Sequence, residues 1–216
     1  MRSAVDGDLT TRARIRDAAI RCFGSEGFGV PVRTVAQEAC VSAALVIHHF
    51  GSKEGLRQAC DEHVLRVIRE AETESMVTAA PAEMLAQLAT VEEYAPVAGY
   101  VVQALLAGGE LAGTFLDKLV RDAEGYLQDA VDAGRMHPSR DPPARARYLV
   151  YLGVGALLVH LRLQPVAARD LGAALRSYAE AVTLPALELY TEGLLTDRTM
   201  LDSYLQYVAS PSGDGT

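Results

Sequence analysis

Residues 36–56 read AQEACVSAALVIHHFGSKEGL, and this stretch decides the fold. Ser42, just after a turn at residues 40–41, is a residue type that caps the N-termini of helices. Val46 and Phe50 are four residues apart, so they lie on one side of a helix and are expected to point into a core. The residues of the same helix that point elsewhere are Ala43, Ala44, Ile47 and His48.

Helices are expected on both sides of this stretch. Pro31 fits the first position of a short preceding helix, and Ser52 fits the cap of a long following one. An earlier helix spans roughly residues 11–24, with Thr10 or Thr11 capping its start. Each helix has an apolar stripe at helical spacing: Ile15, Ala18, Ala19, Cys22 and Phe23, then Val32, Val35, Ala36 and Ala39, and in the long helix Leu56, Ala59, Cys60, His63, Val64 and Val67.

The remainder of the chain has no segment that alternates apolar and polar residues like a strand. Pro and Gly residues divide it into helix-length pieces at roughly 81–94, 96–107, 110–133, 142–163, 168–192 and 196–208, and Pro185 is expected to kink the fifth. We therefore expect an all-α protein of about nine to ten helices. The expected parts are an N-terminal domain at 1–55, a helical domain at 56–208 and a disordered tail at 209–216.

The composition is that of a globular protein, since half of the 216 residues are apolar and 22% are charged. The longest apolar stretch, residues 149–161, is shorter than the roughly 20 residues that span a bilayer, so no membrane partner is expected. No apolar run with a cleavage site marks an export signal at the N-terminus. Three widely spaced cysteines, Cys22, Cys40 and Cys60, suit a reducing compartment. A cytoplasmic protein is expected.

Charge is distributed unevenly along the chain. The formal net charge is −8, which by itself argues against a nucleic-acid partner because phosphate repels an acidic protein. Residues 1–60, however, contain eight basic and six acidic residues, whereas the remainder contains 12 and 22. This asymmetry indicates that an N-terminal module faces an anion, although chance variation on a solvated surface gives the same pattern.

Two short helices joined by a tight turn form a helix-turn-helix, in which the second helix enters the DNA major groove. Small outward residues suit this role, because bulky or acidic ones would collide with or repel the duplex. Here the sequence resembles the TetR family of bacterial transcriptional regulators. The resemblance covers about residues 10–60 and is carried by residues 36–42 and by IHHFGSKEGL at 47–56. It implies an N-terminal three-helix helix-turn-helix DNA-binding domain and a C-terminal helical domain for ligand binding and dimerisation.

More specifically, the segments VSAALVIHHFGSKEGLR and YTEGLL are similar to an actinobacterial subgroup of that family. The subgroup represses genes for ABC-type multidrug efflux transporters.

The sequence departs from the family pattern at the second helix and at the turn. Val30 and Pro31 stand where the family has paired Thr residues, one of which donates to a DNA phosphate. Arg33 or Thr34, near the positive end of the helix dipole, can replace that contact. Cys40 stands where the turn commonly has Gly, so a positive φ there would strain the turn.

In the recognition helix, Leu45 and Ile47 replace the common Thr and Tyr, which favours apolar contacts to thymine methyl groups over hydrogen bonds. Lys53, beside the N–H groups at the start of the long helix, is expected to bind phosphate. Arg12, Arg14 and Arg16 are expected to reach DNA from a flexible arm. The predicted DNA-binding residues are Arg33, Thr34, Ser42, Ala43, Ala44, Leu45, Ile47, His48, His49 and Lys53.

The C-terminal helices contain all nine Tyr residues of the chain. Amphipathic aromatic side chains with a few polar groups suit a pocket for a bulky, mostly apolar ligand, although ordinary packing explains any single one of them. Glu110 is a candidate partner for a cationic ligand, although a solvated carboxylate at a helix N-terminus is the favoured interpretation. The predicted ligand-binding residues are Met84, Tyr94, Tyr100, Gln103, Phe115, Tyr126, Tyr148 and Tyr151.

The helix at 142–163 is apolar on nearly all sides, which predicts burial both by its own domain and by a second subunit. With the helix at 168–192 it is expected to form a two-fold, four-helix interface that sets two recognition helices about 34–36 Å apart. Packing within one protomer is the alternative. The predicted dimer-interface residues are Leu152, Gly153, Ala156, Leu157, His160, Tyr178 and Ala181.

The favoured hypothesis is a homodimeric repressor that binds a palindromic double-stranded DNA operator and is released by a small-molecule inducer. In the alternative, the C-terminal domain serves only dimerisation or protein interaction. No catalytic motif such as GxSxG or HExxH is found in the sequence, so no enzyme is expected. Cys40, His48, His49, Cys60 and His63 form no CxxC or HxxxH pair, so no metal and no cofactor are expected.

Overall fold

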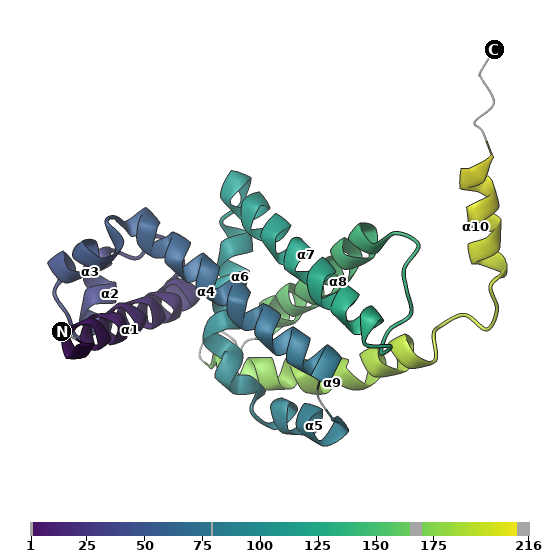
Figure 1. Ribbon diagram of the computed structural model, residues 1–216, viewed down its shortest axis with the longest axis horizontal. Coiled ribbons are helices and arrows are strands. Elements are labelled where there is room, and N and C mark those ends of the chain that lie inside the picture. The colour runs from purple at the N-terminus through teal and green to yellow at the C-terminus, as the bar shows by residue number, and fades with distance from the viewer. Residues whose placement is uncertain (1, 79, 165–169, 211–216) are drawn as a thin grey trace, which may run out of the picture. The chain divides into compact units, whose positions relative to one another are not determined.

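The computed structural model describes residues 2–78, 80–164 and 170–210, with side chains except at residues 2–8, 78, 81 and 84. The described residues form helices and no strand, which confirms the all-α class (Figure 1). The α-helices are α1 (Arg2–Glu26), α2 (Val32–Glu38), α3 (Ala43–Phe50), α4 (Lys53–Thr73), α5 (Pro81–Ala89), α6 (Ala95–Leu106), α7 (Gly109–Asp132), α8 (Pro142–Leu163), α9 (Leu171–Thr191) and α10 (Thr199–Ala209). A π-helical segment, η1 (Glu74–Thr78), follows α4, and a 3-10 turn, η2 (Val91–Tyr94), precedes α6.

Helices α1 to α4 enclose an apolar core built from the predicted stripes. The stripe of α1 is buried. The other buried residues of this core are Val35 and Ala36 of α2, Ala39 directly after α2, Val46 of α3, and Leu56, Cys60 and Val64 of α4. Burial of this apolar area stabilises the two short helices α2 and α3, which have seven and eight residues and are too short to be stable alone. The helical spacing in the sequence therefore predicted most of this interior correctly, whereas Val32, Ala59, His63 and Val67 of the predicted stripes are only partly buried.

Two expectations for α1 are wrong. The helix begins at Arg2, well before Thr10 and Thr11, so neither residue caps it. Arg12, Arg14 and Arg16 consequently lie within a helix and not in a flexible arm, and Arg16 pairs with the neighbouring Asp17 at 2.7 Å. No Pro or Gly breaker stands between residues 8 and 23, which explains why the helix continues toward the N-terminus.

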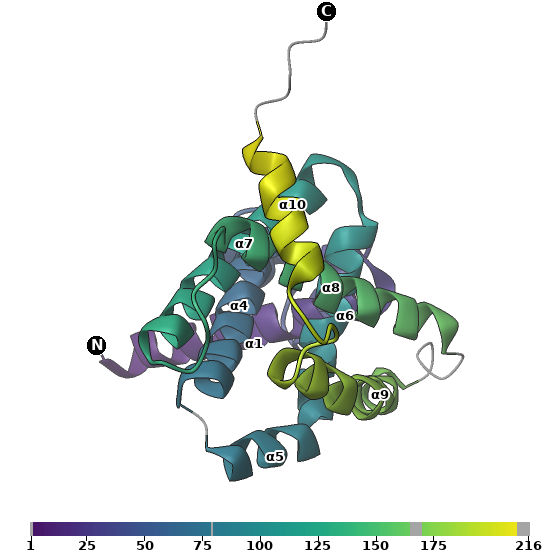
Figure 2. The same ribbon diagram turned by 90° about the vertical axis from the view of Figure 1, so that its right-hand side faces the viewer.

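Helices α4, α6, α7 and α8 continue the same core beyond the first three helices. Helix α1 packs on α6, α4 packs on α7, and α7 packs on α8 (Figures 1 and 2). Gly24 and Gly99 allow α1 and α6 to approach closely, because a Cβ at Gly24 would lie 3.0 Å from the backbone N of Tyr100. Larger residues at this crossing would push the two helices apart.

The chain divides into two compact units, Met1–Tyr178 and Ala179–Thr216. In the first unit α1 packs on α6, and α4 packs on α6 and α7. The domain boundary at residue 55 remains a prediction. The second unit contains the last part of α9, with Pro185 inside the helix, and α10. The tail predicted from residue 209 begins at the last residue of α10, and its residues 211–216 lie outside the described part of the chain.

Helix α8 is long and apolar enough to cross a membrane by length and composition alone, with a mean hydropathy of 1.3 over 18 residues. The sequence expectation counted only uninterrupted apolar residues and therefore missed this property. A single such helix is weak evidence for a membrane span. Its exposed apolar side chains include Tyr148, Tyr151, Leu152, Val159 and Leu163.

Candidate nucleic-acid interface and ligand cavity

The turn between α2 and α3 closes α2 through two backbone hydrogen bonds. The amide of Cys40 donates to the carbonyl of Gln37 at 3.0 Å, and the amide of Val41 donates to the carbonyl of Ala36 at 2.9 Å. This pair of bonds is the Schellman motif, which needs a left-handed residue directly after the helix. Cys40 occupies that position with φ 53°, as the family resemblance led us to expect.

Both ends of α3 are fixed by local hydrogen bonds. The hydroxyl of Ser42 accepts from the amide of Leu45 at 3.2 Å, which confirms the predicted N-cap. Gly51 ends the helix with φ 74°, and its amide donates to the carbonyl of Ile47 at 2.7 Å. These bonds satisfy backbone groups at both helix ends and hold a helix of only eight residues in shape.

Helix α3 buries one side and exposes the other. Val46 is fully buried, whereas Ala43, Ala44 and His48 are exposed and Ile47 is 42% exposed. Leu45, His49 and Phe50 are partly exposed. The exposed side therefore consists of small, apolar and imidazole side chains without an acidic group, which suits contact with base edges and thymine methyl groups.

Candidate phosphate-binding groups flank α3. Arg33 on α2 is exposed, Thr34 is partly exposed, and Lys53 is partly exposed as the first residue of α4. The hydroxyl of Ser52 accepts from the amide of Gly55 at 3.0 Å, which confirms the second predicted cap. The free N–H groups at the start of α4 and the Lys53 ammonium together favour an anion.

Gly55 controls the approach of α4 to α3, a role that sequence reasoning missed. A Cβ at this position would overlap with the carbonyl oxygen of Phe50, the last residue of α3. Only glycine therefore allows this close turn. The signal was present in the sequence as a glycine within the first turn of a helix, where it otherwise lowers stability.

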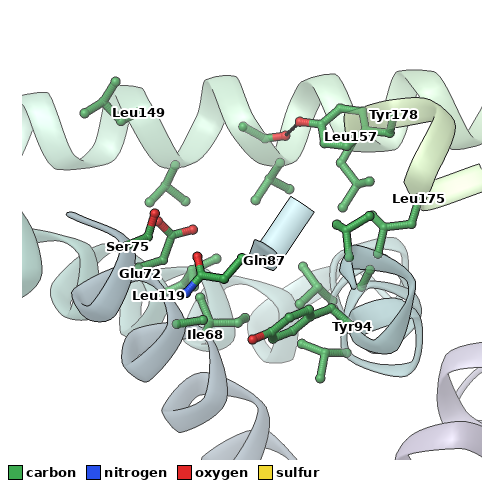
Figure 3. A pocket seen from close by; sticks show the side chains of 18 of the residues that line it. Ile68, Glu72, Ser75, Gln87, Tyr94, Leu119, Leu149, Leu157, Leu175 and Tyr178 are labelled. Carbon is green, nitrogen blue, oxygen red and sulfur yellow. Dashed lines mark hydrogen bonds between the residues drawn. The ribbon is translucent and has the colours of Figure 1, made fainter. Parts of the chain in front are cut away.

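A cavity of about 460 Å³ lies among α4, α6, α7, α8 and α9, with η1, α5 and η2 along its side (Figure 3). Its lining is mostly aliphatic, with Leu119, Val150 and Leu157 among the contributors. The polar groups that line it belong to Glu72, Ser75, Gln87, Tyr94 and Tyr178. A mostly apolar space with a few polar groups is typical of small-molecule sites.

Most residues predicted for this pocket lie elsewhere. Of the eight, Tyr94 lines the cavity, and the side chain of Met84 lies outside the described part of the chain. The other six do not line it: Tyr100 and Phe115 are core residues, Gln103 and Tyr126 are half-buried, and Tyr148 and Tyr151 are exposed on α8. Composition pointed to α6, α7 and α8, which line the cavity, but not to α4 and α9, nor to the side of each helix that faces the cavity. The residues that were missed are mainly aliphatic side chains and Glu72.

The residues predicted for a dimer interface have mixed positions. Gly153, Leu157 and Tyr178 line the cavity, and the hydroxyl of Tyr178 donates to the carbonyl of Gly153 at 3.2 Å. Leu152 is exposed, whereas Ala156 and His160 are partly exposed. Ala181 is exposed in the second unit. Glu110, the predicted partner of a cationic ligand, is exposed at the start of α7 and does not line the cavity.

The sequence belongs with known regulators over nearly its full length. Residues 15–60 match the bacterial regulatory proteins of the tetR family, and residues 92–196 match the tetracyclin repressor-like C-terminal domain. The HTH-type transcriptional regulatory protein RaaS of Mycobacterium tuberculosis is 52% identical over 205 residues, which covers 95% of each chain. The protein is a member of the TetR family. The TetR-family relatives are transcriptional regulators and not enzymes.

Other relatives agree with the TetR-family assignment over parts of the chain. BetI of Burkholderia ambifaria, an HTH-type transcriptional regulator, is 41% identical over 69 residues, or 32% of this chain and 36% of its own. A solved structure described as the molecular basis for control of antibiotic production by bacterial hormones is 26% identical, covers 82% of this chain and 97% of that one, and has a TM-score of 0.56. FadR of Bacillus subtilis in complex with stearoyl-CoA shares the TetR-family fold at 19% identity, with a TM-score of 0.53 and coverage of 85% and 99%.

A polar and aromatic junction connects α6 to α4 and to the loop before α2. The hydroxyl of Tyr100 on α6 donates to the carboxylate of Asp61 on α4 at 2.6 Å, and the Tyr100 ring packs on Phe28 at 5.3 Å. Arg57 of α4 is buried and lies 4.3 Å above the Phe28 ring. Burial raises the pKa of Asp61, and the Tyr100 hydrogen bond opposes that rise. The junction ties α6 to α4 and to the loop that precedes α2.

Proposed function

We propose that the protein is a ligand-responsive repressor that binds a palindromic operator as a homodimer and leaves it when a bulky, mostly apolar molecule occupies the cavity. The observation that carries the proposal is the combination of an exposed, doubly capped α3 with a cavity lined in part by α4, the helix that packs on α3. The exposed side of α3 suits the DNA major groove, and the cavity can bind a small molecule.

The proposed route from cavity to DNA runs through α4 and α6. Helix α4 begins beside α3 at Lys53 and contributes Ile68 to the cavity wall, so one helix spans both sites. Helix α6 contributes Val97, Ala98 and Val101 to the wall, while Gly99 on the same helix packs against Gly24 of α1. A ligand that binds more tightly to one arrangement of α4 and α6 than to another raises the population of that arrangement. Because α4 packs on α3, the position of α3 changes with it.

The required energy is within reach of an apolar ligand. Moving a two-state population from 99:1 to 1:99 takes about 5.5 kcal/mol of differential affinity. At about 25 cal/mol per Å² of buried apolar surface, this corresponds to a few hundred Å² more contact in one state than in the other.

Dimerisation in this proposal uses the exposed apolar face of α8. Tyr148, Leu152 and Val159 are 66%, 40% and 60% exposed, a large apolar content for a helix that faces water. A two-fold contact of this kind would present two copies of α3 to one operator.

We extend the proposal to the controlled genes, which we expect to encode an efflux transporter. The basis is the similarity of residues 41–57 and 190–195 to the efflux-controlling subgroup. Raised transporter transcripts in a strain that lacks the gene would support this extension, and unchanged transcripts would contradict it.

The test is a footprint on the intergenic DNA upstream of the gene that encodes this protein, at low ionic strength, with and without an apolar probe. We expect a protected, two-fold symmetric site and its loss when triphenylphosphine oxide, a neutral probe, is added. Absence of protection would overturn the DNA-binding part of the proposal. Protection that no member of a chemically varied ligand panel removes, together with an unchanged melting temperature, would instead favour a C-terminal domain that serves only dimerisation or protein interaction.

A further inference from the structure

Glu72 is the one charged residue among the described residues that line the cavity. It lies near the end of α4, and in Figure 3 its carboxylate and the polar ends of Ser75 and Gln87 point into the same part of the cavity. The described lining contains no Lys, Arg or His. The electrostatic character of the site therefore depends on a single carboxylate.

The Glu72 carboxylate is partly buried at the cavity wall and has no compensating partner among the described residues. Within the described part of the chain, no hydrogen bond or ion pair reaches it, and burial raises its pKa. A carboxylate in this situation carries a cost, because it has lost part of its hydration and gained no partner in return. Other acidic residues of α4, such as Glu54 and Glu70, are exposed and lie near arginines.

A positively charged ligand would remove this cost. Its charge would pair with the ionised carboxylate in surroundings where water screens poorly, while its apolar groups contact the aliphatic wall. Tyr94 and Tyr178 also line the cavity, and tyrosine rings can attract cations. An anionic ligand would meet a carboxylate and no basic side chain among the described lining residues.

We propose that Glu72 is the counter-ion for a lipophilic cation bound in the cavity, so that the ligand class of this site is bulky, mostly apolar molecules that carry one positive charge. This inference rests on the proposed function, because it assigns the charge of the inducer to a single residue. It differs from the sequence expectation, in which Glu110 was the candidate partner of a cation.

The experiment compares two ions of the same shape and opposite charge, tetraphenylphosphonium and tetraphenylborate, for binding to the full-length protein by equilibrium dialysis. Neutral triphenylphosphine oxide is the third probe. We expect the cation to bind at least about tenfold more tightly than the anion, a difference that one ion pair in a partly screened site supplies.

Three variants test whether Glu72 causes the preference. In Glu72→Gln we expect the cation-to-anion affinity ratio to fall about tenfold. The control Glu70→Gln removes the same charge from an exposed position on the same helix and should leave the ratio unchanged. Gln87→Glu adds a carboxylate that lines the cavity and should raise the ratio, which keeps the test informative if Glu72→Gln does not fold.

The outcomes separate this inference from the proposed function. Equal or tighter binding of tetraphenylborate, an unchanged ratio in Glu72→Gln, or failure of the cation to bind would each overturn the counter-ion role. If triphenylphosphine oxide still released DNA in those cases, the ligand-responsive function would stand and only the charge of the ligand would be wrong. If no probe released DNA although the cation bound through Glu72, the inference would stand and the proposed response would be wrong.

Discussion

At the scale of single residues, Cys40 has a backbone conformation that its side chain disfavours. Its φ of 53° lies in the left-handed region, where a Cβ crowds the backbone, and the Schellman hydrogen bonds of α2 hold it there. The residue is exposed, so it gains little from packing in compensation. This strain lies directly before the N-cap of α3.

We expect Cys40→Gly to stabilise the protein. Glycine removes the left-handed penalty of about 1–2 kcal/mol but adds freedom to the unfolded chain, so the net gain should be about 0.5–1 kcal/mol. Chemical denaturation followed by circular dichroism measures this gain. Cys40→Ala is the control and should have nearly the stability of the natural protein, because it retains the Cβ. A loss of stability in Cys40→Gly would contradict the strain argument.

Glu72 also affects stability in the absence of ligand. Its pKa in the folded protein lies above the ordinary value of 4.5, so the folded state holds the proton more tightly than the unfolded state does. The penalty is therefore absent well below pH 4.5 and grows as pH rises through that value. Among the groups around it, Tyr126 of α7 has its own pKa raised by burial first and then by the charges of Glu72 and Asp122.

From this linkage we expect Glu72→Gln to be more stable than the natural protein at pH 7 and equally stable at about pH 4. Thermal unfolding at a series of pH values measures the difference. Glu70→Gln should show no such gain at pH 7. A variant that is less stable than the natural protein at pH 7 would show that Glu72 has a stabilising partner.

At the scale of elements, the Tyr100–Asp61 hydrogen bond joins α6 to α4, between the proposed DNA-binding helices α2 and α3 and the cavity. Tyr100→Phe keeps the packing of the ring and removes the donor, so Asp61 stays partly buried without this partner. We expect a loss of about 1–3 kcal/mol at pH 7. Because burial raises the pKa of Asp61 in the folded state and loss of the Tyr100 hydrogen bond raises it further, the loss should shrink as pH falls through the raised pKa of Asp61, above the ordinary carboxyl value.

The control for this junction is Tyr94→Phe, since Tyr94 lines the cavity and forms no part of the Tyr100–Asp61 bond. It should keep the stability of the natural protein. An equal loss of stability in both variants, or a loss in Tyr100→Phe that does not depend on pH, would contradict the role assigned to the Asp61 bond.

How far the sequence predicts the structure also depends on the element. The caps at Ser42 and Ser52 and the end of α3 at Gly51 were predictable, because they depend on neighbouring residues. The Tyr100–Asp61 bond joins residues 39 apart, and spacing along one helix says nothing about such a pairing. For the same reason, composition placed a pocket in the C-terminal helices but not on the correct sides of those helices.

At the scale of the whole molecule, the account requires two copies of the chain. Several apolar side chains of α8 are exposed among the described residues, and in this proposal a second subunit covers them. The unusual hydropathy of α8 has the same explanation in this proposal. One chain alone would present a single α3 to the operator.

We expect Leu152→Glu to break the dimer, because it places a carboxylate in the proposed apolar contact. Light scattering after size-exclusion chromatography should show the mass of one chain, and operator affinity should fall at least about tenfold as the second reading head is lost. Leu106→Glu changes an exposed leucine on α6 and should remain dimeric. A dimeric Leu152→Glu would move the interface elsewhere.

The most direct test of the central claim, that the exposed side of α3 reads DNA, is the affinity of Ala44→Glu for the upstream intergenic DNA at low ionic strength. The account predicts that this variant folds normally and loses protection of the site, because a carboxylate would face the bases and phosphates. The control Ala144→Glu adds the same charge at an exposed position in the first turn of α8 and should bind normally. Ala44→Glu with the affinity of the natural protein would contradict the account.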